Sequence, residues 1–137
     1  MAVVALCLTA ASVDAQGFKW WKDDTVQKRL SLSPDQSRRI DDVFQMAMPS
    51  LRTGKQRLDL AEQDLQALIE HSDDDAPVVR QLELVEAARA ELNKSRTLML
   101  LQMRRVLSPD QRVTLDALSR ERARDARGPG RPSSHRP

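Results

Sequence analysis

Apolar residues along the chain recur with a helical period. From Ile40 to Leu68 they alternate at spacings of four and three residues, and a similar rhythm runs from Val85 to Val106. This spacing puts apolar side chains on one narrow face of each helix, as in helices that pack along a seam. The segment 71–77, HSDDDAP, interrupts the pattern. The sequence therefore predicts two long antiparallel helices that form a hairpin.

Two residues in the first long helix depart from ordinary helix formers. Pro49 lacks a backbone N–H, but the pattern keeps its phase across this site, so Pro49 should kink the helix rather than end it. Gly54 lies on the seam and permits the helices to approach closely. Asp75 is available to cap the second long helix, which we expect to begin near Val78.

The pentapeptide LSPDQ occurs twice, and each copy has the features of a helix start. The serine is placed as a helix cap, the proline takes the first helical position, and the glutamine follows the serine by three residues. This combination is a capping box with a preorganised proline. We assign the repeat an architectural role, in which replacing Gln36 or Gln111 lowers stability before it alters binding. The residues with this role are Leu32, Ser33, Pro34, Gln36, Leu107, Ser108, Pro109 and Gln111.

The composition agrees with an all-α fold. Hydrophobic residues make up 40% of the 137 positions and aromatic residues only 3%, and there is no tyrosine. Such a profile is poor in strand-forming residues. A short helix is expected around Thr25–Leu30, after Trp20 and Trp21, and a last helix from Pro109 to about Arg124.

The two ends of the chain differ from the helical part, which we place at residues 16–124. Residues 1–15, MAVVALCLTAASVDA, contain an apolar run of signal-peptide length. We expect export with cleavage after Ala15, and the alternative is a buried N-terminal helix. Cleavage would remove Cys7, the single cysteine. Residues 125–137 are predicted to form a disordered basic tail, with weak attraction to an anionic membrane as the alternative.

Catalytic chemistry has little support in the sequence. The two histidines, His71 and His135, stand at a helix end and in the tail, and no Ser/His/Asp set, glycine-rich phosphate loop or HExxH motif occurs. We predict that the protein is not an enzyme and takes no cofactor or small-molecule substrate. Because export is expected, nucleic acid is not expected as a partner.

Two groups of residues have side chains that metals accept. His71 lies beside three aspartates, and methionines 46, 48, 99 and 103 could supply thioethers. We interpret the first group as a loop that caps helices and the second as core or adaptable contact surface. The sequence therefore predicts no metal site.

The stretch 98–103, LMLLQM, is apolar nearly all round its helix. A single seam cannot bury this much apolar surface. The remainder must be covered by another helix, by a second subunit or by a bound protein.

Two L-[ST]-x-x-Q motifs that open helices in a small, exported helical chain resemble the LTxxQ-motif proteins, the Spy/CpxP family of periplasmic chaperones and stress regulators. Residues 18–36, FKWWKDDTVQKRLSLSPDQ, are also similar to members with paired tryptophans before the first motif. The resemblance covers roughly residues 18–124. It implies a bent four-helix cradle that dimerises through its long helices and holds unfolded proteins without ATP. Serine replaces threonine in both motifs and keeps the capping chemistry, whereas Pro49 bears on the curvature of the cradle.

On this basis we expect a periplasmic, homodimeric, ATP-independent chaperone that binds unfolded or misfolded proteins. One alternative is a metal- or stress-sensing regulator that docks on a membrane sensor, and another is a structural dimer without clients. Flexible methionines can repack around unlike partners, and basic side chains attract acidic ones. The residues expected to contact clients are Phe44, Met46, Met48, Leu98, Met99, Leu101, Met103, Arg52 and Arg96.

Overall fold

The computed structural model describes residues 19–128, and within that range it contains helices and no strands. The prediction of an all-α fold is therefore confirmed. The predicted signal peptide and residues 129–137 of the predicted tail lie outside the described residues. The elements are η1 (Trp20–Lys22), α1 (Asp24–Leu30), α2 (Pro34–His71), α3 (Asp75–Val106) and α4 (Pro109–Arg127).

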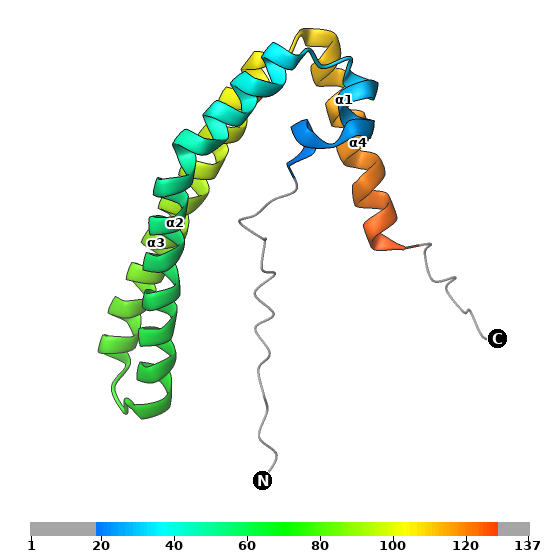
Figure 1. Cartoon of the computed structure of the whole chain (residues 1–137). Helices are drawn as coiled ribbons and strands as arrows, with labels where there is room; N and C mark the ends of the chain where they lie inside the picture. The colour runs from blue at the N-terminus through cyan, green and yellow to red at the C-terminus, as the bar shows by residue number, and fades with distance from the viewer. Residues whose placement is uncertain (1–18, 129–137) are drawn as a thin grey trace, which may run out of the picture.

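The two long helices α2 and α3 lie side by side and are joined by the short segment 72–74 (Figure 1). Helix α2 continues through Pro49 without interruption. At Gly54 the backbones come close, because a Cβ atom there would lie 3.3 Å from Cδ1 of Leu92. The absence of a side chain at this seam position lets α3 pack directly against α2, as the sequence predicts.

The remaining elements form a shorter arm at an angle to the long pair (Figure 1). Helix α4 leads away from the end of α3, and α1 packs against it. Leu118 of α4 is buried together with Val26 and Leu30 of α1. The element η1 lies within the angle between the two arms and contacts α2.

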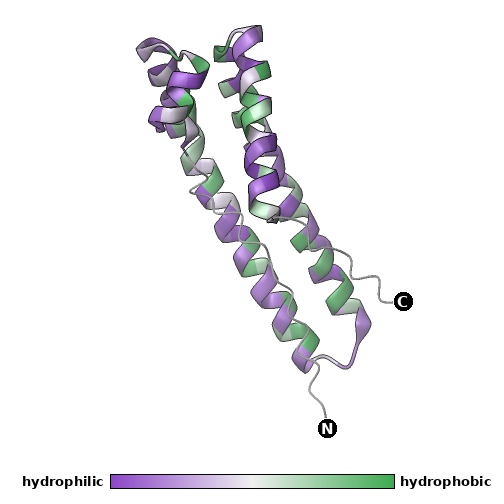
Figure 2. Ribbon diagram, turned by 90° about the vertical axis from the view of Figure 1, so that its right-hand side faces the viewer, coloured by the Kyte–Doolittle hydropathy of each residue, from purple (hydrophilic) through white to green (hydrophobic). Residues whose placement is uncertain are grey.

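The buried core gathers near this bend and thins out toward the far end of the hairpin. Ile40, Leu107 and Trp21 are among the residues of the main buried cluster. By contrast, no residue from 52 to 84 is buried, although Figure 2 shows hydrophobic residues alternating with polar ones along both long helices. The far half of the hairpin therefore leaves apolar side chains in contact with water.

Two helix boundaries differ from those expected. Helix α3 begins at Asp75 rather than near Val78, because the side chain of Asp74 caps it and Pro77 fits within its first turn. Helix α4 continues to Arg127, three residues beyond the expected end, and stops at Gly128, whose φ is 70°. The expectation that the disordered tail begins at residue 125 is therefore wrong for residues 125–127. These residues are helical because the alanines and arginines of this segment favour a helix.

Candidate functional site

The two motif glutamines meet at the bend. The Nε2 of Gln36 donates to the Oε1 of Gln111 at 2.8 Å, and the Nε2 of Gln111 donates back to the Oε1 of Gln36 at 3.0 Å. Each Nε2 also donates to a carbonyl that precedes the other motif, Gln36 to Val106 at 3.2 Å and Gln111 to Leu30 at 3.1 Å. The glutamine pair thus joins the starts of α2 and α4 to the ends of α3 and α1.

Each glutamine also completes a capping box. The Ser33 hydroxyl accepts from the backbone N–H of Gln36, and the Ser33 N–H donates to the Oε1 of Gln36, both at 3.1 Å. Ser108 and Gln111 repeat this arrangement at 3.2 and 2.8 Å. Each amide oxygen accepts two hydrogen bonds. The Nε2 of Gln36 donates two, and the Nε2 of Gln111 has a third, longer contact of 3.5 Å with the carbonyl of Ser31, so both side chains are saturated. A glutamate would serve the capping box equally well, but it could not donate to the opposite carbonyl.

Ion pairs connect α4 to α3 of the long pair and to α1 of the short arm. Arg104 of α3 binds Asp116 of α4 through two hydrogen bonds of 2.6 and 2.8 Å, and this bonding lowers the pKa of Asp116. Arg29 of α1 binds Glu121 of α4 at 2.8 Å and lowers the pKa of that glutamate. These four side chains are roughly half exposed, so the pairs orient the arm more than they stabilise it.

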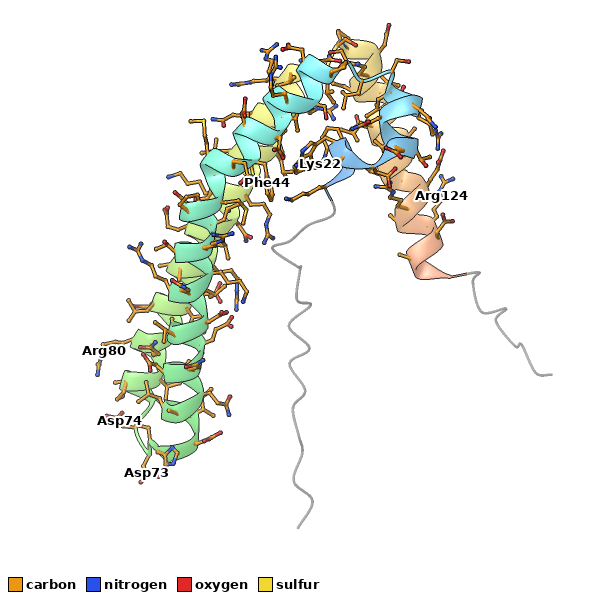
Figure 3. All side chains as sticks on the ribbon, in the orientation of Figure 1. Lys22, Phe44, Asp73, Asp74, Arg80 and Arg124 are labelled. Atoms are coloured by element: carbon orange, nitrogen blue, oxygen red, sulfur yellow. The ribbon has the colours of Figure 1, made fainter. Side chains whose placement is uncertain are left out.

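An aromatic cluster fills the inner side of the bend. The ring centroids of Trp21 and Phe44 lie 5.0 Å apart, and the indole Nε1 of Trp21 donates to Asp41 at 3.1 Å. Lys22, labelled with Phe44 in Figure 3, pairs with the same carboxylate at 3.1 Å. Partial burial alone raises the pKa of Asp41, but the hydrogen bonds from Lys22 and Trp21 outweigh burial and lower it. Trp21 is therefore a packing residue of the bend.

Three of the predicted client contacts are buried. Phe44, Met99 and Met103 belong to the main core cluster. Phe44 and Met99 are positions of the four-three seam, so the same pattern that predicts the hairpin also places them between the helices. In this structure the three side chains pack in the core, so they are not included among the proposed client contacts.

The other predicted contacts remain accessible in the described chain. Met46 is 82% exposed, Leu98 49% and Leu101 41%. Arg52 is exposed, while Met48 and Arg96 are partly buried.

A groove that the sequence did not predict lies between the two arms. It has a volume of about 320 Å³ and is lined by residues of η1, α1, α3 and α4. Leu100, which is 49% exposed, lines it together with Trp20 and Leu115. Since 98–103 is apolar nearly all round its helix, the sequence indicated surplus apolar surface here, but not which leucine faces the groove.

The acidic loop at the far end of the hairpin caps helices. The carboxylate of Asp74 accepts from the N–H of Ala76 at 3.1 Å, and the Nδ1 of His71 contacts the carbonyl of Ala67 at 2.9 Å. Figure 3 shows Asp73 and Asp74 at the tip, far from the bend. Within residues 19–128, no three histidine, cysteine, aspartate or glutamate side chains gather where they could hold a metal ion.

Comparison with known proteins gives one match. The family described as "LTXXQ motif family protein" matches residues 19–119, a span that includes both motifs, the aromatic cluster and the glutamine pair. No curated protein and no solved structure matches the chain. Among the helices that the structure describes, none combines the length and the apolar character needed to cross a membrane.

Proposed function

Because the chain belongs to the LTXXQ motif family, a periplasmic, non-enzymatic family of Spy/CpxP-like proteins, we propose that it is an exported chaperone that works without ATP. It binds unfolded or partly folded proteins on the surface of α3 next to the bend. The glutamine pair sets the angle between the arms and takes no part in the binding itself.

The observation that supports this proposal is a group of exposed leucines on α3. Leu98, Leu100 and Leu101 surround the buried Met99 and are all exposed to a large extent. Single exposed leucines are ordinary, but Leu98 and Leu101 are three residues apart and so are neighbours on one face of α3. Adjoining exposed apolar side chains are typical of a surface that contacts another protein. Leu100 also lines the groove between the arms, which gives an extended apolar segment a place to bind.

Side chains around these leucines suit a binder of many clients. Met46 is a long, unbranched and polarizable side chain on α2, and such side chains adapt to partners of different shape. Arg52 and Arg96 supply positive charge that attracts acidic segments from a distance and leaves binding reversible. Client contact through Met46, Met48, Arg52 and Arg96 is part of the proposal.

A second copy of the chain is the proposed cover for the far half of the hairpin. Residues 52–84 contain no buried side chain, so this part lacks a core of its own. A homodimer formed along this half would bury the exposed apolar side chains there and leave the bend free for clients. The side chains in question are Leu60, Ile69, Val79, Leu82 and Leu84.

The test is the aggregation of a chemically denatured protein, followed by light scattering without ATP. The chain that begins at Gln16 retains every described residue and is the form to use. We expect suppression at near-stoichiometric ratios and a clear loss of suppression when Leu98 and Leu101 are both replaced by serine. Val113→Ser, a change at a 70% exposed position on α4, is the matched control and should have no effect.

Two results would contradict the proposal. Unchanged suppression by the Leu98→Ser/Leu101→Ser variant would show that clients bind elsewhere. No suppression by the unaltered chain would favour the regulator that docks on a membrane sensor.

A further inference from the structure

Positive charge is concentrated at the C-terminal end of the chain. Residues 119–137 contain six arginines and two acidic residues, whereas residues 1–118 contain sixteen basic and eighteen acidic residues. The last part of the chain is therefore strongly basic while the rest is slightly acidic. Such an asymmetry is typical of a segment that meets a polyanionic surface.

The described part of this segment is the C-terminal half of α4, and two of its arginines share one face. Arg120 and Arg124 are four residues apart, so their side chains are neighbours on the helix. Leu118, on another face, is buried against α1. Figure 3 shows Arg124 on the side of α4 that points away from the long arm. This outward side of α4, with Arg120 and Arg124, is called the arginine face. Arg127 is the next arginine along the sequence.

The charges of the arginine face are only partly balanced by the acidic residues nearby, since Arg120 interacts with Asp116 and Arg124 with Glu121 without direct contact. Asp116 is held by Arg104, and Glu121 is held by Arg29. Among the described residues, neither Arg120 nor Arg124 forms an ion pair of its own. Two acids of α4 are thus bound by arginines of other helices, and from residue 119 onward the arginines outnumber the acids by six to two, so an external anion meets a net positive charge.

We propose that the arginine face of α4 docks the protein on a membrane surface of anionic phospholipids. One guanidinium group can donate two parallel hydrogen bonds to two oxygens of a phosphate. Each arginine close to an anionic bilayer raises the partitioning of the protein onto that membrane roughly fivefold. A row of charges along one straight helix suits a planar layer of headgroups. The groove lined by Leu100 lies between the arms, so a docked protein would still present it to clients.

This binding should be peripheral and sensitive to salt. The apolar side chains Leu115 and Leu118 contribute to the interior of the short arm, and Val113 is a single exposed apolar residue, so α4 has no continuous apolar face free to enter the bilayer. Charge alone then holds the protein, and screening weakens it as ionic strength rises. The inference does not depend on the chaperone proposal, because a regulator or structural dimer could dock in the same way.

The test is co-sedimentation of the chain from Gln16 with vesicles of phosphatidylglycerol and phosphatidylethanolamine in equal parts. We expect binding at about 50 mM salt, little binding at about 300 mM, and none to phosphatidylcholine vesicles. Replacing Arg120, Arg124 and Arg127 by glutamine should lower partitioning by at least about tenfold.

The matched control replaces three exposed arginines of α2 and α3 by glutamine and so removes the same charge elsewhere. Its positions are Arg39, Arg57 and Arg80, and partitioning should fall less than about twofold. Equal losses in the two triple variants would overturn the proposal, because net charge and not the arginine face would then be responsible. Binding to phosphatidylcholine vesicles as strong as binding to the anionic vesicles would also overturn the proposal. So would binding to duplex DNA that is tighter than binding to the anionic vesicles and is lost in the α4 variant.

Discussion

Replacing Gln111 by alanine should destabilise the bend while leaving the exposed surface of α3 intact. The change removes two hydrogen bonds with Gln36, one with the carbonyl of Leu30 and one with the N–H of Ser108. Each such bond contributes about 0.5–1.5 kcal/mol net, and water can replace part of them because the site is only partly buried. We therefore expect the free energy of unfolding to fall by about 2–4 kcal/mol.

The assay is urea denaturation followed by circular dichroism and by the fluorescence of the two tryptophans at the bend. Gln45→Ala is the matched control, because Gln45 is an exposed glutamine within α2. It should change the free energy of unfolding by no more than about 0.5 kcal/mol. If Gln111→Ala behaves like Gln45→Ala, the glutamine pair does not hold the bend together, and the reasoning fails.

A double-mutant cycle separates the pair from the two caps. If Gln36 and Gln111 act on each other, the loss in the double alanine variant should be smaller than the sum of the single losses by about 1–2 kcal/mol. Additive losses would mean that each glutamine only caps its own helix.

The isosteric Gln111→Glu variant adds a further check, since its carboxylate cannot donate to the carbonyl of Leu30 at neutral pH. Acidification restores a donor and should reduce its deficit.

Three other changes test the packing and the charges. The pKa of Asp116 is lowered, so its pair with Arg104 stabilises the fold above about pH 3.9 and is lost as pH falls through the lowered value. Urea midpoints of Asp116→Asn should therefore decline less than those of the unaltered chain between about pH 5 and 2. Gly54→Leu should cost about 1–3 kcal/mol in a thermal melt, because a side chain would push into Leu92, while Gly54→Ala should be nearly neutral. Pro49→Ala should raise the melting temperature by restoring a helical N–H, and an unchanged or lower value would contradict the expectation that the proline destabilises α2.

The helices could be predicted from the sequence because their signals are local. The four-three seam gives the extent of α2 and α3, and the motif at Ser33 gives the residue at which α2 begins. The close approach of the two helices at Gly54 could also be predicted, because a glycine on a seam has few explanations other than close packing. The start of α3 was missed because Pro77 resembles a helix start, whereas Asp74 is the residue that caps it.

The glutamine pair could not be predicted from the same signals. A capping box explains Gln36 and Gln111 one at a time, and nothing local indicates that residues 75 positions apart touch. Their meeting depends on the lengths of α2 and α3, which return the chain to the place where α2 began.

The sequence also did not show which side chains of residues 98–103 are buried. A stretch that is apolar nearly all round its helix has no broad polar face to show which side is exposed, so the buried residues could not be chosen from the sequence pattern. In the folded chain Met99 and Met103 enter the core, while Leu98, Leu100 and Leu101 stay accessible.

The most direct test of the account is site-specific photo-crosslinking to a denatured client. A photoreactive residue placed at Leu100, or at Leu98, should form adducts with the client in the absence of ATP. The same residue placed at Ile69, in the half of α2 assigned to the dimer, should instead join two copies of the chain. Client adducts at Ile69 with none at Leu98 or Leu100 would contradict the assignment of the bend as the client-binding surface.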